Sequence, residues 1–395
     1  MGIGWTVAHR ATVLDNDIVL GAGDVKSLAD AVVVDGPAAF RRLMLRPQTA
    51  VAVARLFVRQ LHARTPSKCL DGVLVSVVFD KAKKMPPQRA LVAASRARAK
   101  PVDSEGVRLD PAKLSPGHLQ TTFDWESLLS DATSKMAVWE LLGRAVFEQL
   151  CAHDGCIVEV VTADAVFVRD LAGALPVRRA TSHGEADLMV ALRASEFAAV
   201  GRVVEVVTVD YDQVLQALVC PTKTSCAWAL RFKAEVVDVG RLIQTYGGDS
   251  RSLRLSAAFF MLCAFKSDYS KSLCRATKSR VAHFLTAMKT GVAAITEREC
   301  ALTGARTLVF RPRVFLDVVP GWPVGVGHAT ATAMLEHVLW TVAYFAGYDS
   351  FRPEWGGPPE ITLSRSDDDS VAWTQFACMD VLHETFVYRP TTVSA

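Results

Sequence analysis

The chain has 395 residues and a formal net charge of +3, with 50% hydrophobic and 22% charged residues. This composition excludes an intrinsically disordered chain and supports a sizeable core, in one large domain or in one domain with an appendage. Because the net charge is small, a nucleic-acid partner would have to be bound by local basic patches rather than by the charge of the whole molecule.

Compartment and targeting signals are weak. The 9 cysteines form no CxxC pair, which favours a reducing intracellular compartment, nucleus or cytoplasm, over a disulfide framework. Cys151, His153 and Cys156 resemble half of a zinc site, but no second ligand pair follows, so buried structural cysteines fit better. We expect no secretory signal and no membrane span, since no apolar run reaches roughly 18 residues. The start MGIGWT also fits the short myristoylation pattern at Gly2.

Three Val-rich runs in chain order each stop at an acid. AVVVDG ends at Asp35, GVLVSVVFD ends at Asp80, and RVVEVVTVDYD ends at Asp210 and Asp212. Continuous apolar runs, rather than alternating ones, are typical of strands buried on both faces. Helical patterns fall between them, at 38–62, 125–152 and 185–199. The alternation predicts an α/β fold, a parallel sheet flanked by helices.

The remaining segments differ from this alternation. Residues 81–124 begin with a basic stretch and continue as a polar, proline-containing one, which predicts a basic helix followed by a loop. After residue 290 the acid-ending runs stop and Gly, Pro and Trp become frequent. The sequence therefore predicts a core over residues 1–290 and a C-terminal appendage of unknown role over residues 291–395.

The acids suggest a metal centre. Ligands of open α/β sheets bind outside the carboxyl ends of the strands, where the acids of the three runs would meet. Further acids stand at the start of an expected helix and after an apolar one. The full candidate set, each member a metal ligand and catalytic residue, is Asp35, Asp80, Glu185, Asp187, Asp210, Asp212 and Asp268.

Such a cluster is tolerable only if cations neutralise it. Seven converging carboxylates repel one another strongly in a protein interior. Oxygen ligands select Mg²⁺ or Mn²⁺, and two such ions about 4 Å apart can activate a water and stabilise the leaving oxygen of a phosphodiester. Any one of these acids could instead be a turn former or a helix cap, so the interpretation depends on the whole set.

Two basic runs could hold a phosphate backbone. The first follows Asp80, and a helix over 88–100 would place Arg89 and Arg96 on one face. The second follows Asp268 and contains Lys271, Lys278 and Arg280. The second run could equally be a solvated helix face; the first could be one too, although it adjoins the proposed metal ligand Asp80.

These segments, in this order, resemble the 5′-nuclease superfamily, which includes the flap endonucleases and the Xrn-type 5′→3′ exoribonucleases. MGI, VVVDG, VVTVDYDQVL and FMLCAFKSDYSKSL are similar to its N-terminus, its first metal-binding strand, its DxD strand and a later Asp-containing segment. FDKAKKMPPQRA, LSPGHL and HGEADLMVALR are similar to Xrn-type segments. Compact members of the superfamily are familiar from large DNA viruses.

The resemblance implies a PIN-like fold, two-metal hydrolysis near a nucleic-acid 5′ end, and substrate contacts at Gly2, Lys84 and Gln88. Some residues depart from it. CRATKSR lacks the Gly-x-Gly hairpin of the flap endonucleases, Lys266 stands where Gly is usual, and Leu91 and Val92 replace Xrn-type arginines.

We therefore expect a metal-dependent nuclease acting on RNA or DNA, with Xrn-like 5′→3′ exonuclease activity slightly favoured over flap endonuclease activity. The competing expectation is a degenerate nuclease fold that serves as a binding or scaffold module.

Overall fold

The structure is a computed structural model of the whole chain. It describes residues 13–14, 18–21, 29–64, 70, 72–80, 113–130, 132–163, 165–170, 173–176, 185–220, 228–232, 235–267, 270, 272–273, 277–299, 306–318 and 328–346. The chain divides into two compact units. The first, which we call the sheet unit, is Val19–Gln213 with Ser225–Asp238, and the second unit is Met1–Ile18, Val214–Thr224 and Val239–Ala395.

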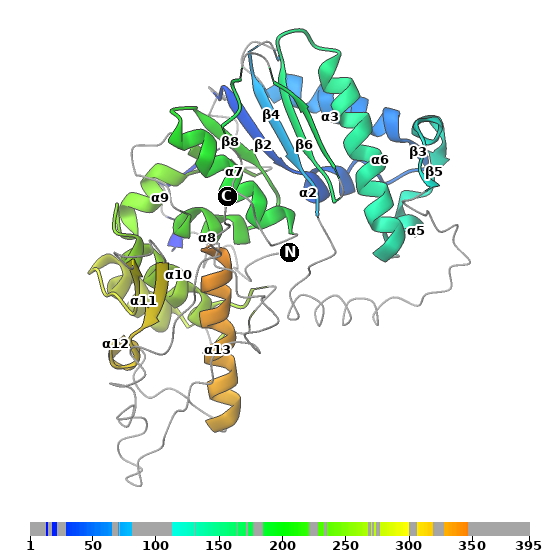
Figure 1. The fold of residues 1–395 in the computed structure, drawn as a ribbon. Coiled ribbons are helices and arrows are strands. Elements are labelled where there is room, and N and C mark those ends of the chain that lie inside the picture. The colour runs from blue at the N-terminus through cyan, green and yellow to red at the C-terminus, as the bar shows by residue number, and fades with distance from the viewer. Residues whose placement is uncertain are drawn as a thin grey trace. The chain divides into compact units, whose positions relative to one another are not determined.

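An eight-stranded sheet in the order β1-β10-β9-β8-β2-β4-β6-β7 organises the sheet unit (Figure 1). Its five central strands, from β9 to β6, are parallel, while β1, β10 and β7 pair antiparallel at the two sides. This is the mostly parallel α/β sheet that the sequence predicts. The strands are β1 (Val19–Gly21), β2 (Ala31–Asp35), β4 (Leu74–Val78), β6 (Ile157–Val161), β7 (Val166–Arg169), β8 (Val204–Val207), β9 (Trp228–Arg231) and β10 (Glu235–Asp238).

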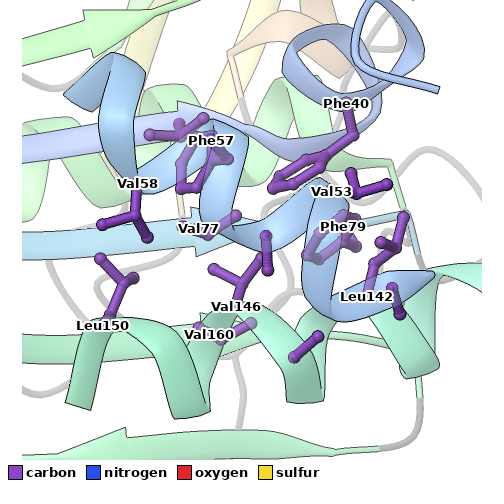
Figure 2. Close-up of a cluster of buried hydrophobic side chains, with 14 of the residues drawn as sticks. Phe40, Val53, Phe57, Val58, Val77, Phe79, Leu142, Val146, Leu150 and Val160 are labelled. Carbon is purple, nitrogen blue, oxygen red and sulfur yellow. The ribbon is translucent and has the colours of Figure 1, made fainter. Parts of the chain in front are cut away.

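One face of the sheet is covered by α3 (Ala50–Arg64) and α6 (Ala132–Cys151), and over β2, β4 and β6 this face is apolar. Figure 2 shows the side chains of Val77 and Val160 from the strands between residues of the two helices, among them Val58 and Leu150. Every residue of β2, β4 and β6 is buried. Removing this much apolar surface from water is the main stabilising contribution to such a core.

The predicted helix over 38–62 is wrong as one element, because the chain breaks it into α2 (Gly36–Arg41) and α3. Pro47 lies between them; its ring restricts the residue before it to extended conformations. The strand β3 (Gln48–Thr49) follows and pairs with β5 (Thr122–Phe123). The helix predicted over 125–152 is likewise two helices, α5 (Trp125–Ser130) and α6. The helix predicted over 185–199 agrees with α7 (Ala186–Ala199).

The opposite face of the sheet is covered by α7 and contains charged groups. Arg193 donates two hydrogen bonds to Glu159 of β6, at 2.8 Å and 3.0 Å, and one to Glu196 at 2.6 Å. Ser76 of β4 donates to the same Glu159 carboxylate at 2.8 Å, and the Arg193 guanidinium lies 4.4 Å from the centre of the Phe197 ring. All of these polar residues are buried. The network joins α7 to the middle of two strands.

The second unit packs helices around a β-hairpin. Within it, Arg251 and Arg254 of α10 donate to the last carbonyls of α8, at Val219 and at Leu218 and Cys220. Burial, with the nearby Arg251 charge, lowers the pKa of Arg254 to about 10. Residues 239–290 and the described part of 291–346 belong to this same unit. Its elements are α8 (Asp212–Val219, which begins in the sheet unit), α9 (Val239–Thr245), α10 (Arg251–Ala264), α11 (Lys278–Lys289), β11 (Ile295–Glu299), β12 (Arg306–Phe310), α12 (Pro312–Val318) and α13 (His328–Phe345).

Among the helices of the described residues, none has both the length and the apolar character needed to cross a membrane.

Candidate functional site

Three acids lie at the carboxyl edge of the sheet, on neighbouring parallel strands. Asp35 is the last residue of β2, Asp80 follows the end of β4, and Asp210 follows the end of β8. Because β2 pairs with β4 on one side and with β8 on the other, the three strand ends are adjacent. Val-rich strands that run in parallel thus deliver their acids to one edge, as the sequence predicts.

Asp35 joins the strand β2 to the helix α2. Its Oδ1 accepts a hydrogen bond from the Ala38 N–H at 3.1 Å, which caps the helix. Gly36 allows the helix to start against the neighbouring strand, since a Cβ there would lie 2.7 Å from the Phe79 ring and 2.8 Å from the Val78 carbonyl oxygen. Asp35 therefore caps the helix, and Gly36 follows it because a larger side chain would not fit.

Asp80 joins three elements. Its Oδ1 accepts from the N–H of Ala186, the first residue of α7, at 3.1 Å. Its Oδ2 pairs with the Lys135 ammonium of α6, also at 3.1 Å. Asp80 thereby holds the start of α7, where Glu185 and Asp187 stand, beside the strand end.

Asp210 shapes the loop between β8 and α8. Its Oδ1 accepts from the N–H of Asp212, and its own N–H donates to the Thr208 hydroxyl, both at 3.1 Å. The Thr208 hydroxyl donates in turn to Oδ2 of Asp35 at 3.4 Å. Gln213 donates to the backbone carbonyl of Asp187 at 2.7 Å, which joins the start of α7 to the segment after β8 within the sheet unit.

Mutual repulsion among the acids is visible at Asp35. Burial, the largest cause, and the negative charge of Asp187 raise the pKa of the Asp35 carboxyl well above 3.8. The charges of Asp80 and Asp210 add to this, while the Ala38 N–H acts in the opposite direction. Four carboxylates from β2, β4, α7 and β8 therefore lie within electrostatic reach of one another.

The donor atoms of these acids are of the type that a hard divalent cation prefers. Asp35, Glu185, Asp210 and Asp212 are buried, and an uncompensated cluster of carboxylates in such a position is unfavourable. Carboxylate oxygens are the ligands that Mg²⁺ and Mn²⁺ prefer. As they stand, no three His, Cys, Asp or Glu side chains in the described part of the chain are close enough together to form a group that could hold a metal ion. The last predicted ligand, Asp268, lies outside the described residues.

Most of the residues predicted to bind nucleic acid also lie outside the described residues. This applies to Gly2, Lys84, Gln88, Arg89, Arg96 and Lys271. Lys278 is the first residue of α11, and Arg280 is exposed in the first turn of that helix. The roles of all eight stay predictions.

The sequence interpretation missed several residues beside the acids. Lys135 contacts the acid edge from a position with no distinctive motif around it, whereas Thr208 lies within the quoted VVTVDYDQVL segment but was not predicted as a site residue. A third feature did leave a signal: residues 36–64 contain six arginines and no acid. This composition could have been recognised from the sequence, and its position in the structure is described below.

Neither a comparison with models of known protein families nor a search of curated proteins found a match to this chain.

Proposed function

We propose that this protein is a divalent-metal-dependent nuclease with a PIN-like fold that hydrolyses phosphodiester bonds at or near nucleic-acid 5′ ends. The observation that supports this most is the carboxyl edge of the sheet, where buried Asp35 is in electrostatic contact with Asp187, Asp80 and Asp210. Such an arrangement of acids is unfavourable in isolation and favourable around divalent ions.

In this proposal Asp35, Asp80, Glu185 and Asp187 hold one Mg²⁺ or Mn²⁺ ion, and Asp210, Asp212 and Asp268 complete a second site. The bound ions would supply a nucleophilic water and neutralise charge on the phosphate. The protein's own residues fix the carboxylates: the N–H groups of Ala38, Ala186 and Asp212 each orient one oxygen of an acid.

The proposed direction of cleavage, from the 5′ end, rests on sequence resemblance. AKKMPPQR and HGEAD are similar to Xrn-type segments, which favours a 5′→3′ exonuclease over a flap endonuclease. CRATKSR lacks the glycines of the flap endonuclease hairpin, which also weighs against duplex binding.

A second candidate, a binding or scaffold protein built on a degenerate nuclease fold, is favoured by one observation. Asp80 is already satisfied by the Lys135 ammonium and by the Ala186 N–H, so this acid is stable without a metal ion. A fold that has lost catalysis could retain the acid for these contacts alone.

The experiment compares hydrolysis of 5′-labelled single-stranded RNA and of flapped DNA in Mg²⁺, in Mn²⁺ and in EDTA. We expect Mg²⁺-dependent cleavage and a loss of roughly a hundredfold or more in Asp210→Asn, since even the outer contacts of metal ligands typically contribute 10–100-fold. The asparagine keeps an oxygen that can accept the Asp212 N–H.

The matched control is Asp154→Asn, which removes an exposed carboxylate from the turn before β6, at the amino edge of the sheet. It should leave cleavage unchanged. Binding of both substrates without cleavage in any metal would support the scaffold, cleavage of RNA alone would exclude the flap endonuclease, and insensitivity to a blocked 5′ end would contradict an exonuclease.

A further inference from the structure

An arginine-rich surface lies directly after the proposed metal site in the chain. Five arginines of α2, of the turn after it and of α3 are exposed. Within the described residues, no side chain forms an ion pair or hydrogen bond with any of them. We call this group the arginine surface; it consists of Arg41, Arg42, Arg46, Arg55 and Arg59.

Along the sequence, no acid interrupts this surface. No Asp or Glu occurs between Asp35 and Asp71 in the sequence. Exposed arginines usually alternate with acids on a helix face, where weak ion pairs stabilise the helix. A chain with a net charge of only +3 has no general need for such a concentration of one sign. The surface is therefore suited to bind an anion.

A cavity of about 290 Å³ lies beside Arg42, one residue of the arginine surface, and beside Thr208, which follows β8. Arg42 from the end of α2 and Gln60 from α3 line it, together with Phe57, and Thr208 closes it from the β8 side. The same Thr208 donates a hydrogen bond to Asp35. Thr208 thus lies between the cavity and the Asp35 carboxylate. A nucleic-acid strand that reaches the acids could place an adjacent phosphate beside Arg42.

Arginine is suited to this ligand. Its planar guanidinium can donate two parallel hydrogen bonds to a phosphate, and its charge is retained at any physiological pH. Arg55 and Arg59 are one turn apart on the exposed side of α3, so their guanidinium groups can follow successive phosphates of a flexible strand.

We propose that the arginine surface binds the phosphate backbone of a single-stranded nucleic acid, with one phosphate in the cavity against Arg42. This deepens the proposed nuclease function, on which it rests for the identity of the anion. It assigns substrate binding to α2 and α3, in addition to the basic runs that the sequence pointed to.

The test measures binding and not cleavage. Fluorescence anisotropy of a 5′-labelled single-stranded RNA, and of a DNA of the same sequence, is recorded in EDTA over a series of salt concentrations. We expect Arg42→Ala, and the double variant Arg55→Ala/Arg59→Ala, each to weaken binding roughly tenfold or more at low salt, as for the loss of charged hydrogen bonds. The slope of log affinity against log salt should fall by roughly 0.7 for each phosphate contact removed. Arg42→Lys should retain part of the affinity.

The matched control is Arg202→Ala. Arg202 is a partly exposed arginine of the same unit that pairs with Asp30 at 3.7 Å, at the amino edge of the sheet. Its removal should leave affinity and salt slope unchanged. Since the side chains of the arginine surface are exposed and Arg202 forms only a surface ion pair, thermal unfolding of the variants should match that of the parent protein.

The two proposals fail separately. Cleavage with unchanged binding in the arginine variants would overturn the arginine surface and leave the nuclease in place. Tight, arginine-dependent binding without cleavage in any metal would retain the surface and remove the nuclease. No binding of either strand, or equal losses in Arg202→Ala, would overturn the inference, as would arginine-dependent binding only to vesicles of anionic lipid.

Discussion

The two faces of the central sheet are built in different ways. Over β2, β4 and β6, the face toward α3 and α6 is apolar, with Phe, Val, Leu and Trp side chains in mutual contact. The face toward α7 contains a buried cluster of Ser76, Glu159, Arg193 and Glu196, with directed hydrogen bonds between 2.6 Å and 3.0 Å. Apolar packing tolerates small shifts, whereas a bidentate guanidinium–carboxylate pair allows one relative position.

The difference matters because α7 begins at the candidate site. Glu185 is its N-cap and Asp187 stands in its first turn, so the position of the helix sets where their carboxylates lie. The apolar face stabilises the fold, and the charged face fixes the helix whose start contains two of the proposed ligands. That the charged cluster fixes the position of α7 is a hypothesis, since buried ion pairs contribute to specificity in some proteins and not in others.

The largest effect is expected from breaking the charged face. Glu159→Ala should destabilise the protein by about 3–5 kcal/mol, because it leaves the Arg193 guanidinium buried without its main partner. Urea or thermal unfolding measures the loss. The variant should also bind Mg²⁺ more weakly, seen as a smaller stabilisation by the ion, because α7 is no longer held in register.

Leu142→Ala is the comparison on the apolar face. It should cost about 2–5 kcal/mol through lost burial and a cavity, yet leave the affinity for Mg²⁺ as it was. Replacing Glu159, Arg193 and Glu196 together by Leu should recover most of the stability but not the Mg²⁺ affinity. If the two single variants lose Mg²⁺ affinity equally, the two faces do not differ in this role.

A smaller effect is expected where the apolar face meets the acid edge. Gly36→Ala should destabilise the protein by about 1–3 kcal/mol, because the new methyl group would meet the Phe79 ring and the fixed Val78 carbonyl. Chemical denaturation measures the cost. Gly117→Ala, where a Cβ would meet only the Ser115 hydroxyl at 3.5 Å, is the control. An equal cost at both positions would contradict the steric argument.

The smallest effect concerns the pH dependence of stability. The pKa of Asp35 is raised above 3.8 in the folded protein by burial and by Asp187, so the folded state holds this proton more tightly than the unfolded state does. Without metal, the stability that this group contributes is therefore greatest below 3.8 and is lost as pH rises through the raised pKa. Asp35→Asn should remove that loss and raise the Tm of the metal-free protein at neutral pH, by roughly 2–4 °C for each kcal/mol.

Melting curves across this pH range, with and without Mg²⁺, provide the measurement. Added Mg²⁺ should stabilise the parent protein most at neutral pH and Asp35→Asn much less. Parallel pH profiles for the two proteins would contradict the repulsion inferred at Asp35.

The elements that the sequence predicted best are those in which local pattern and tertiary context agree. Three Val-rich runs that stop at acids become parallel strands with adjacent ends, because a run buried on both faces has few other places in a protein. The helix α7 agrees with its predicted range because no proline or glycine interrupts it and most of its residues are apolar.

The rest depended on partners far apart in the chain. Glu159 stands alone as an acid within a Val-rich strand of the sequence. Its partner Arg193 lies 34 residues later, and only the fold brings the two together. Lys135 stands 55 residues from Asp80 and has no motif that would link the two. Pro47 is a local signal that the chain leaves its helix after α2. The predicted helix over 38–62 followed the apolar periodicity on either side of this proline instead.

One oxygen of each strand-end carboxylate is committed to a backbone amide, at Ala38, Ala186 and Asp212. Selection for folding alone would therefore retain these side chains, even in descendants that no longer turn over any substrate. Persistence of the acids among related sequences would be poor grounds for inferring turnover. The substitution that separates folding from catalysis, in related sequences and in experiments, is Asp to Asn, which preserves the contact with the backbone amide and abolishes the charge.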